Sequence, residues 1–309
     1  MNTSSKRSYD RYSELFNKAC SSVLFLIIAL LTSALCVGNI INVFDAISTG
    51  NAITICITVL PALFITLTTI GLWILFINAK KNSVNGSTFG LVKSYPKFEQ
   101  VIKIITFILV IIAIVAIIIG LFTLKLKIDE AIKETGGSLE ELKDQMHVSF
   151  GGVEIPKEYV DIFNQTIEKF IDRYDYYLTT GITIATVIGV VTIIFIILEL
   201  IRCSMLVKLI SSAGKMFKTG HMQAPPSIFF CVLNFIFGAI NIFASFAAIT
   251  FNIFDFSWEM CLPGVTGVIL VLIGIIVMIN VRELKKIYSE WQTEIGMVSA
   301  DAAAANGTK

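Results

Sequence analysis

The side chains best placed for chemistry form a polar stripe in an apolar stretch toward the C-terminal end. Its members recur at spacings of four, three, four, three and four residues, which puts them on one helical face: Asn234, Gly238, Asn241, Ser245, Ala248 and Asn252. Amides inside a bilayer need partners, because no water reaches them. The stripe predicts either a helix contact that shares amide hydrogen bonds or a polar path or ligand site. No acidic residue joins it, which favours the contact.

Glu199 is the only acid inside an apolar run, and Arg202 follows it by three residues. A carboxylate that relays protons would lie deeper in the membrane, whereas this one lies near the end of its run. The spacing therefore favours an ion pair at the membrane interface.

A short echo in the sequence marks a third set of polar residues. Asn42-Val43-Phe44-Asp45 and Asn252-Ile253-Phe254-Asp255 each follow an apolar run. The echo indicates either a parallel repeat of two hairpins or two similar turns in which Asn and Asp cap helices. Asn42, Asp45 and Asp255 are thus candidate residues of an outer turn motif.

Sequence motifs for enzymatic chemistry are missing from the chain. It has no phosphate-binding loop, nucleophile elbow, zinc-binding HExxH, dinucleotide fingerprint or pair of acids within a span. Six cysteines are scattered without a CxxC, and there are only two histidines. We therefore expect no enzyme, no cofactor, no metal centre and no binding of nucleic acid.

The elements that must position these residues are membrane-spanning helices. The chain has 309 residues, 55% of them hydrophobic and 15% charged, with a mean hydropathy of +0.80, which excludes a soluble domain. The run 104–124 holds 21 uncharged residues, enough for a helix about 30 Å long to cross a bilayer. Six runs predict an all-α, polytopic membrane helix bundle, with spans near residues 21–43, 53–77, 104–124, 179–201, 227–251 and 262–281.

These spans divide the chain into four parts. Residues 1–124 hold a cytoplasmic N-terminus and the first three spans, and residues 179–281 hold the last three. Between them, residues 125–178 form an extracellular helical loop segment. Residues 282–309 form a cytoplasmic amphipathic tail.

The orientation follows from lysine and arginine, which accumulate on the cytoplasmic side of membrane proteins. Residues 1–19 hold four, 78–103 five, 202–226 four and 282–309 four, and the short loops between spans hold none. We therefore expect both termini in the cytoplasm and residues 125–178 outside.

Two segments between spans have helical patterns of their own. In 125–178, Lys125–Glu134 extends the third span, a capping box opens a helix over 138–148, and an amphipathic helix covers 157–178. In 202–226, a basic helix is predicted to lie on the membrane surface, with partner binding as the alternative. Its apolar stripe consists of Met205, Leu206, Leu209, Ile210, Ala213, Met216 and Phe217.

The stretch from Gly71 to Lys81, GLWILFINAKK, followed by Gly90-Leu91 before a new span, resembles uncharacterised multi-pass membrane proteins of Gram-positive bacteria. The likeness covers one hairpin. It implies a plasma-membrane location and no particular activity.

Two functions remain open from the sequence. The first is an interaction or sensory scaffold with an outward-facing helical segment. The alternative is a small-solute transporter or channel subunit that uses the polar face of the fifth span. The absence of a buried charge and of paired, broken helices favours the first. The expected partners are the lipid bilayer and either a second copy or another membrane protein.

Overall fold

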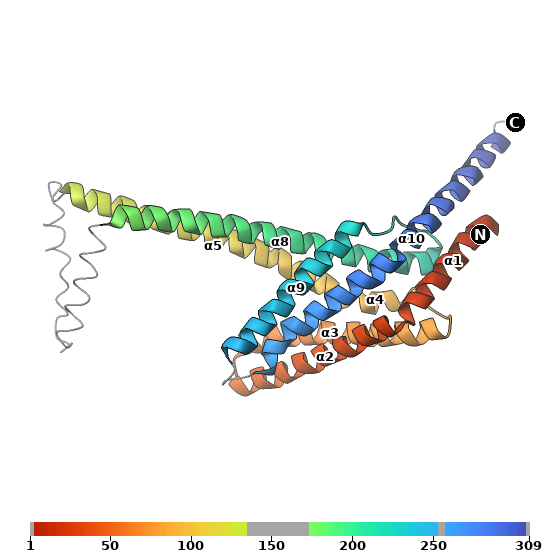
Figure 1. The fold of residues 1–309 in the computed structure, drawn as a ribbon, viewed down its shortest axis with the longest axis horizontal. Coiled ribbons are helices and arrows are strands. Elements are labelled where there is room, and N and C mark those ends of the chain that lie inside the picture. The colour runs from red at the N-terminus through yellow and green to blue at the C-terminus, as the bar shows by residue number, and fades with distance from the viewer. Residues whose placement is uncertain (1–2, 135–172, 253–256, 307–309) are drawn as a thin grey trace. The chain divides into compact units, whose positions relative to one another are not determined.

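A computed structural model describes residues 3–134, 173–252 and 257–306. These residues are nearly all helical and contain no strand (Figure 1). Six helical segments among them are long and apolar enough to cross a membrane. The predicted fold class is confirmed, and the chain is a multi-pass membrane protein.

The helices divide between two compact units. The first unit comprises residues 1–103 and 198–309, and the second comprises residues 104–197. Two long helices, α5 (Ser94–Glu134) and α8 (Tyr174–Thr219), contribute to both. The other elements belong to the first unit: α1 (Thr3–Cys20), α2 (Val23–Thr49), α3 (Ala52–Lys80), α4 (Thr88–Val92), α9 (Ile228–Phe251), the short 3-10 helix η1 (Trp258–Cys261) and α10 (Leu262–Asn306).

The turn between α2 and α3 lies later in the chain than the sequence echo predicts. Asn42 and Asp45 are inside α2, which ends at Gly50 with a left-handed φ of 67°. Asn51 then caps α3, its side chain accepting hydrogen bonds from two backbone amides. Asn252, by contrast, caps the end of α9. Asn42 and Asn252 therefore differ in local structure, whereas residues 253–255 of the second copy, Asp255 included, lie outside the described residues.

α8 continues far beyond the predicted fourth span. The basic stretch that was expected to form a separate helix on the membrane surface is instead its C-terminal part, which ends at Gly220 with a φ of 70°. The apolar stripe packs inside the protein: Ala213 contacts the cluster around Phe89, and Met216 contacts Ile287 and Trp291 of α10. A stripe that looks like a membrane-binding face is covered by the chain itself.

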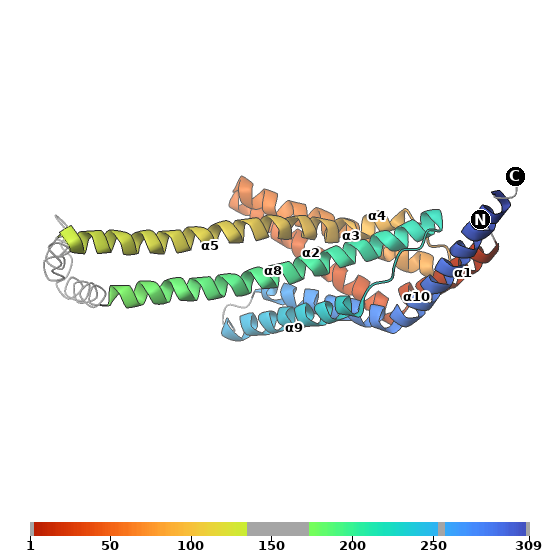
Figure 2. The same ribbon diagram turned by 90° about the horizontal axis from the view of Figure 1, so that it is seen from above.

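α1 and the second half of α10 lie side by side, so that two segments distant in sequence meet (Figures 1 and 2). Ser8 Oγ donates to Glu294 at 2.8 Å. Arg11 forms an ion pair with Glu290 and lies 3.9 Å from Glu283. Helix α1, which belongs to the predicted N-terminal segment, is thus bound to the predicted C-terminal tail.

The second unit is an antiparallel pair formed by α5 and α8. The backbone of α8 approaches α5 closely at Gly189, where an added Cβ would lie 2.9 Å from the side chain of Ile114. Toward the far end Lys125 pairs with Asp175 at 2.5 Å, and the Tyr174 hydroxyl donates to Asp129 at 2.7 Å. α5 is helical through Glu134. The helix predicted over 138–148 lies outside the described residues, as does the part of the helix predicted over 157–178 that precedes residue 173.

Candidate functional site

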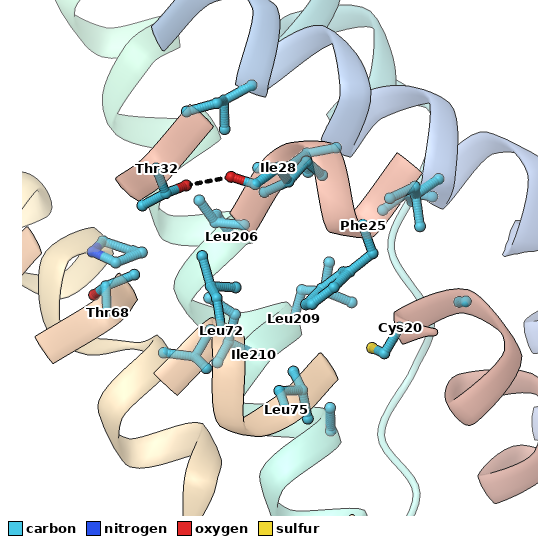
Figure 3. A pocket seen from close by; sticks show the side chains of 18 of the residues that line it. Cys20, Phe25, Ile28, Thr32, Thr68, Leu72, Leu75, Leu206, Leu209 and Ile210 are labelled. Carbon is cyan, nitrogen blue, oxygen red and sulfur yellow. Dashed lines mark hydrogen bonds between the residues drawn. The ribbon is translucent and has the colours of Figure 1, made fainter. Parts of the chain in front are cut away.

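The first unit encloses a cavity of about 280 Å³. Its walls come from α1, α2, α3, α4, α10 and those parts of α5 and α8 that belong to this unit. Most of the lining is aliphatic or aromatic, and Figure 3 shows α2, α3 and α8 side chains converging on it: Phe25, Ile28, Leu72, Leu75, Leu206, Leu209 and Ile210. A concave apolar site with a few polar groups is typical of small-molecule binding.

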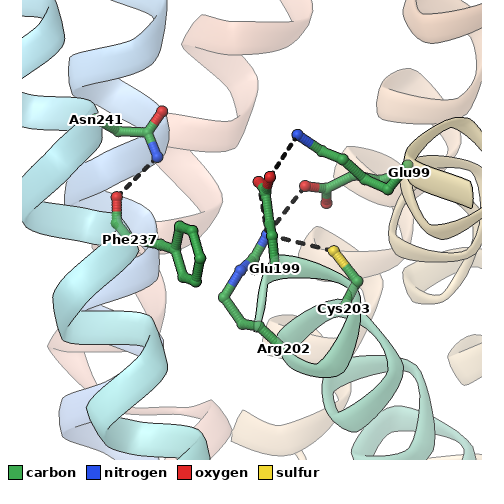
Figure 4. Close-up of polar contacts among 7 residues, drawn as sticks. Glu99, Glu199, Arg202, Cys203, Phe237 and Asn241 are labelled. Atoms are coloured by element: carbon green, nitrogen blue, oxygen red, sulfur yellow. Dashed lines mark hydrogen bonds and ion pairs between the residues drawn. The ribbon is translucent and has the colours of Figure 1, made fainter. Parts of the chain in front are cut away.

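The polar wall of this cavity contains Glu99 and Arg202. Arg202 is only 1% exposed, and its Nη2 donates to Glu99 Oε1 at 3.0 Å (Figure 4). Glu199 Oε1 lies 3.8 Å from the same Nη2, and Glu199 Oε2 accepts from Lys103 Nζ at 2.8 Å. Four charged side chains from α5 and α8 therefore form one network, which we call the charged cluster: Glu99, Lys103, Glu199 and Arg202.

The guanidinium of Arg202 is only partly satisfied by this network. Besides the two carboxylates, Nη2 lies 3.3 Å from Cys203 Sγ, and the ring centroid of Phe237 is 5.9 Å from Cζ. Nε and Nη1 are buried and have no acceptor among the described residues. A buried N–H group without an acceptor is costly, and more so when it is charged. Three N–H bonds of this cavity-lining side chain therefore have no acceptor among the described residues.

The sequence predicts the pair of Glu199 with Arg202 but not its setting. Arg202 is buried rather than placed at an interface, and Glu99 is its nearer carboxylate. One signal was present: Glu99 and Lys103 are four residues apart, as charges that share a helical face would be. What the sequence lacks is the register between α5 and α8, which tertiary packing decides.

The polar face predicted on α9 lies against α10. A Cβ added at Gly238 would lie 2.9 Å from the carbonyl oxygen of Gly267, and one added at Gly264 would lie 2.8 Å from Ser245 Oγ. Close approach of small residues is a common way to pack membrane helices. Asn234 is fully buried on this face, whereas Asn252 is exposed at the helix end.

The amides on this face bind within their own helix. Asn234 Nδ2 donates to the Phe230 carbonyl at 2.8 Å, and Asn241 Nδ2 donates to the Phe237 carbonyl at 2.7 Å (Figure 4). Asn252 does the same with Ala248. Side chains can reach the carbonyl four residues back, which competes with bonds between helices. Of the four candidate polar residues, Ser245 is the one with a recorded bond to another element, the carbonyl of Met260 in η1.

This face opens onto neither of two cavities found among the described residues of the first unit. The lining of the 280 Å³ cavity contains none of Asn234, Asn241, Ser245 and Asn252. A second cavity of about 220 Å³ lies between α8 and the segment before α9, where Ser212 Oγ donates to Gln223 at 2.6 Å, and it contains none of them either. The site with the most developed chemistry is therefore the larger cavity with the charged cluster.

Two further candidates from the sequence stay apart from this site. Asn42 and Asp45 lie on α2, where the buried amide oxygen of Asn42 has no partner among the described residues and Asp45 is exposed. Groups of three or more His, Cys, Asp or Glu side chains able to hold a metal ion do not occur within the described residues.

The chain matches no protein-family model, no curated protein and no solved structure.

Proposed function

We propose that the chain is an interaction or sensory scaffold of a bacterial plasma membrane rather than an enzyme. Both termini lie in the cytoplasm, and residues 125–178 face outside. The alternation of lysine and arginine between segments supports this orientation. The likeness of residues 71–81 to multi-pass proteins of Gram-positive bacteria supports the membrane assigned.

The observation that carries the proposal is the continuity of α8. This single helix begins at Tyr174, within the proposed outer segment 125–178, and runs to Thr219. Near its end, Met216 is 1% exposed and packs with Ile287 and Trp291 of α10 and partly buried residues of α1. A continuous helix with one end in each region is a physical route by which an event at the outer segment can bias the packing of α1 and α10.

The second unit supplies the surface for partners. No residue of Ile104–Leu124 is buried within the chain, and the isoleucines and valines along this run are mostly exposed. Such a surface needs a cover of lipid or of other membrane helices. The bilayer is the first partner we propose, and a second copy or another membrane protein is the next.

Hydrogen exchange in lipid nanodiscs tests the proposed coupling. An epitope inserted within residues 138–148 would be bound by an antibody fragment. We expect binding to change the exchange of backbone amides in 12–16 of α1 and 287–291 of α10. No change in either segment would overturn the sensory role.

A matched pair of variants tests whether α8 carries the effect. Val190→Pro interrupts α8, and Val115→Pro interrupts α5, both at exposed positions of the second unit. We expect the change in exchange to disappear in Val190→Pro and to persist in Val115→Pro. Its persistence in both would show that α8 is not the route.

The alternative, a small-solute transporter or channel subunit, rests on the polar face of α9. Close contacts with Gly264 and Gly267 of α10 cover this face at Ser245 and Gly238. A path along it would require α9 and α10 to separate, so we place this function second.

A further inference from the structure

We propose that the cavity of the first unit binds an uncharged, lipid-like molecule with an apolar body and one carbonyl-type oxygen, which accepts hydrogen bonds from Arg202. This inference gives the proposed sensor its ligand and therefore rests on that function. The two can fail separately, because ligand binding is measured without any outer stimulus.

The lining defines the body of the ligand. Leucine, isoleucine and phenylalanine dominate the wall, and Ile65 within it is only 1% exposed. The α2 residues that line the cavity extend from Phe25 to Leu35, which is about 15 Å along the helix axis. An apolar space whose lining extends this far along one helix suits a chain-like molecule better than a compact polar solute.

The head group is defined by the free donors of Arg202. Its Nε and Nη1 are buried, have no acceptor among the described residues, and belong to a side chain that lines the cavity. Arginine offers donors only, so the complementary group must be an acceptor. An oxygen placed there would satisfy N–H groups that the protein leaves unpaired.

The charge balance of the charged cluster argues for an uncharged acceptor. Arg202 and Lys103 carry two positive charges, and Glu99 and Glu199 carry two negative ones, with contacts of 3.0 Å and 2.8 Å between the closest partners. A carboxylate or phosphate would add an unbalanced negative charge beside Glu99, which also lines the cavity. A ketone, ester or similar carbonyl adds none.

Photolabelling of the full chain in nanodiscs tests the inference. The probes are a long-chain methyl ester with a diazirine in its chain and the matching free acid, used at a pH where the acid is ionised. We expect the ester to label peptides of α2, α3 or α8 that line the cavity, and an excess of unlabelled ester to suppress this labelling. Labelling by the ester that cannot be competed would overturn the inference, because it would reflect partition into lipid.

Two positions on α3 give the matched control. Leu72 is 8% exposed and lines the cavity, whereas Leu63 is 51% exposed and does not. We expect Leu72→Trp to fill the space and reduce competed labelling at least about tenfold, and Leu63→Trp to leave it unchanged. Equal labelling of the two variants would overturn the cavity as the site. If Leu72→Trp does not fold, competition by unlabelled ester on the unmodified chain still decides whether the ester binds a saturable site.

The head group is tested by Arg202→Lys and by comparing the probes. Lysine keeps the positive charge beside Glu99 but loses the planar guanidinium. We expect ester binding to weaken about tenfold, as for the loss of one hydrogen bond to a charged donor. Stronger competed labelling by the free acid than by the ester would overturn the uncharged head group and indicate an anionic ligand.

Discussion

Lys103 Nζ lies 2.8 Å from Glu199 Oε2, and this ion pair joins α5 to α8 at one end of their uncharged stretches. At the other end of these stretches, Lys125 lies 2.5 Å from Asp175. The two lysines enclose 21 uncharged residues of one helix, about the thickness of the hydrocarbon core. The two ion pairs thus indicate where α5 and α8 leave the bilayer.

The first prediction compares these two pairs. Glu199 is only 20% exposed and also lies near Arg202, so Glu199→Gln should lower the free energy of unfolding by about 1–3 kcal/mol. Asp175 is 66% exposed, and Asp175→Asn should have no measurable effect at high salt. Unfolding in a denaturing detergent measures both. A larger effect at Asp175 would show that the pair of Lys103 with Glu199 is not the more stabilising of the two.

The second prediction concerns topology. In a variant with Cys56 and Cys261 replaced by serine, an impermeant thiol reagent applied to intact cells should label Ser138→Cys but not Ser4→Cys. Those two cysteines are removed because they are the ones not buried. Permeabilised cells, in which Ser4→Cys should react, provide the control. Labelling of Ser4→Cys alone in intact cells would reverse the proposed orientation.

The third prediction addresses the contact of α9 with α10. A Cβ at Gly238 would lie 2.7 Å from Val271 and 2.9 Å from a backbone oxygen of Gly267, so Gly238→Ala should destabilise the protein by about 1–3 kcal/mol. Gly120 on α5 has open space around it, and Gly120→Ala should be neutral or slightly stabilising. Thermal unfolding in detergent compares the two variants. Equal melting temperatures would show that α9 and α10 do not pack this closely.

The fourth prediction is a loss of stability at alkaline pH. Burial raises the pKa of the Tyr12 phenol above its ordinary value, so the folded state favours the neutral form. The contribution of Tyr12 is then fully present below the ordinary pKa of about 10 and is lost as the pH rises from there toward the folded pKa.

Tyr12→Phe provides the comparison for this effect. The phenylalanine variant should lose less stability than the unmodified chain between neutral and strongly alkaline pH, because its ring cannot ionise. Hydrogen exchange of α1 across this range measures the difference. Identical profiles would show that the Tyr12 phenol ionises freely in the folded state.

The spans were predictable from the sequence because the length of an uncharged run is itself the physical requirement for crossing a bilayer. What covers a polar or apolar stripe was not predictable. The stripe of 205–217 has the same period whether it lies on lipid or on Trp291, and only tertiary packing distinguishes these cases.

The candidate site was likewise predictable where its contacts are local in sequence and not where they depend on tertiary packing. The pair of Glu199 with Arg202 is local in sequence, so its spacing revealed it. The nearer partner, Glu99, is 103 residues away, and its contact depends on how α5 packs against α8. The sequence left open whether the amides of Asn234 and Asn241 bond to another helix or to their own, and both donate to the carbonyl four residues back.

The attachment of α1 to α10 has a consequence for biogenesis. Arg11 and Glu290 are 279 residues apart, so this contact cannot form until α10 has been synthesised. A chain made from its N-terminus therefore holds α1 without its native partner while the intervening spans are inserted. During that interval the aromatic face of Tyr9, Tyr12 and Phe16 needs a temporary cover, and the surface of the membrane is the nearest one. Closure of the first unit is thus a late event in assembly, timed by the arrival of the last span.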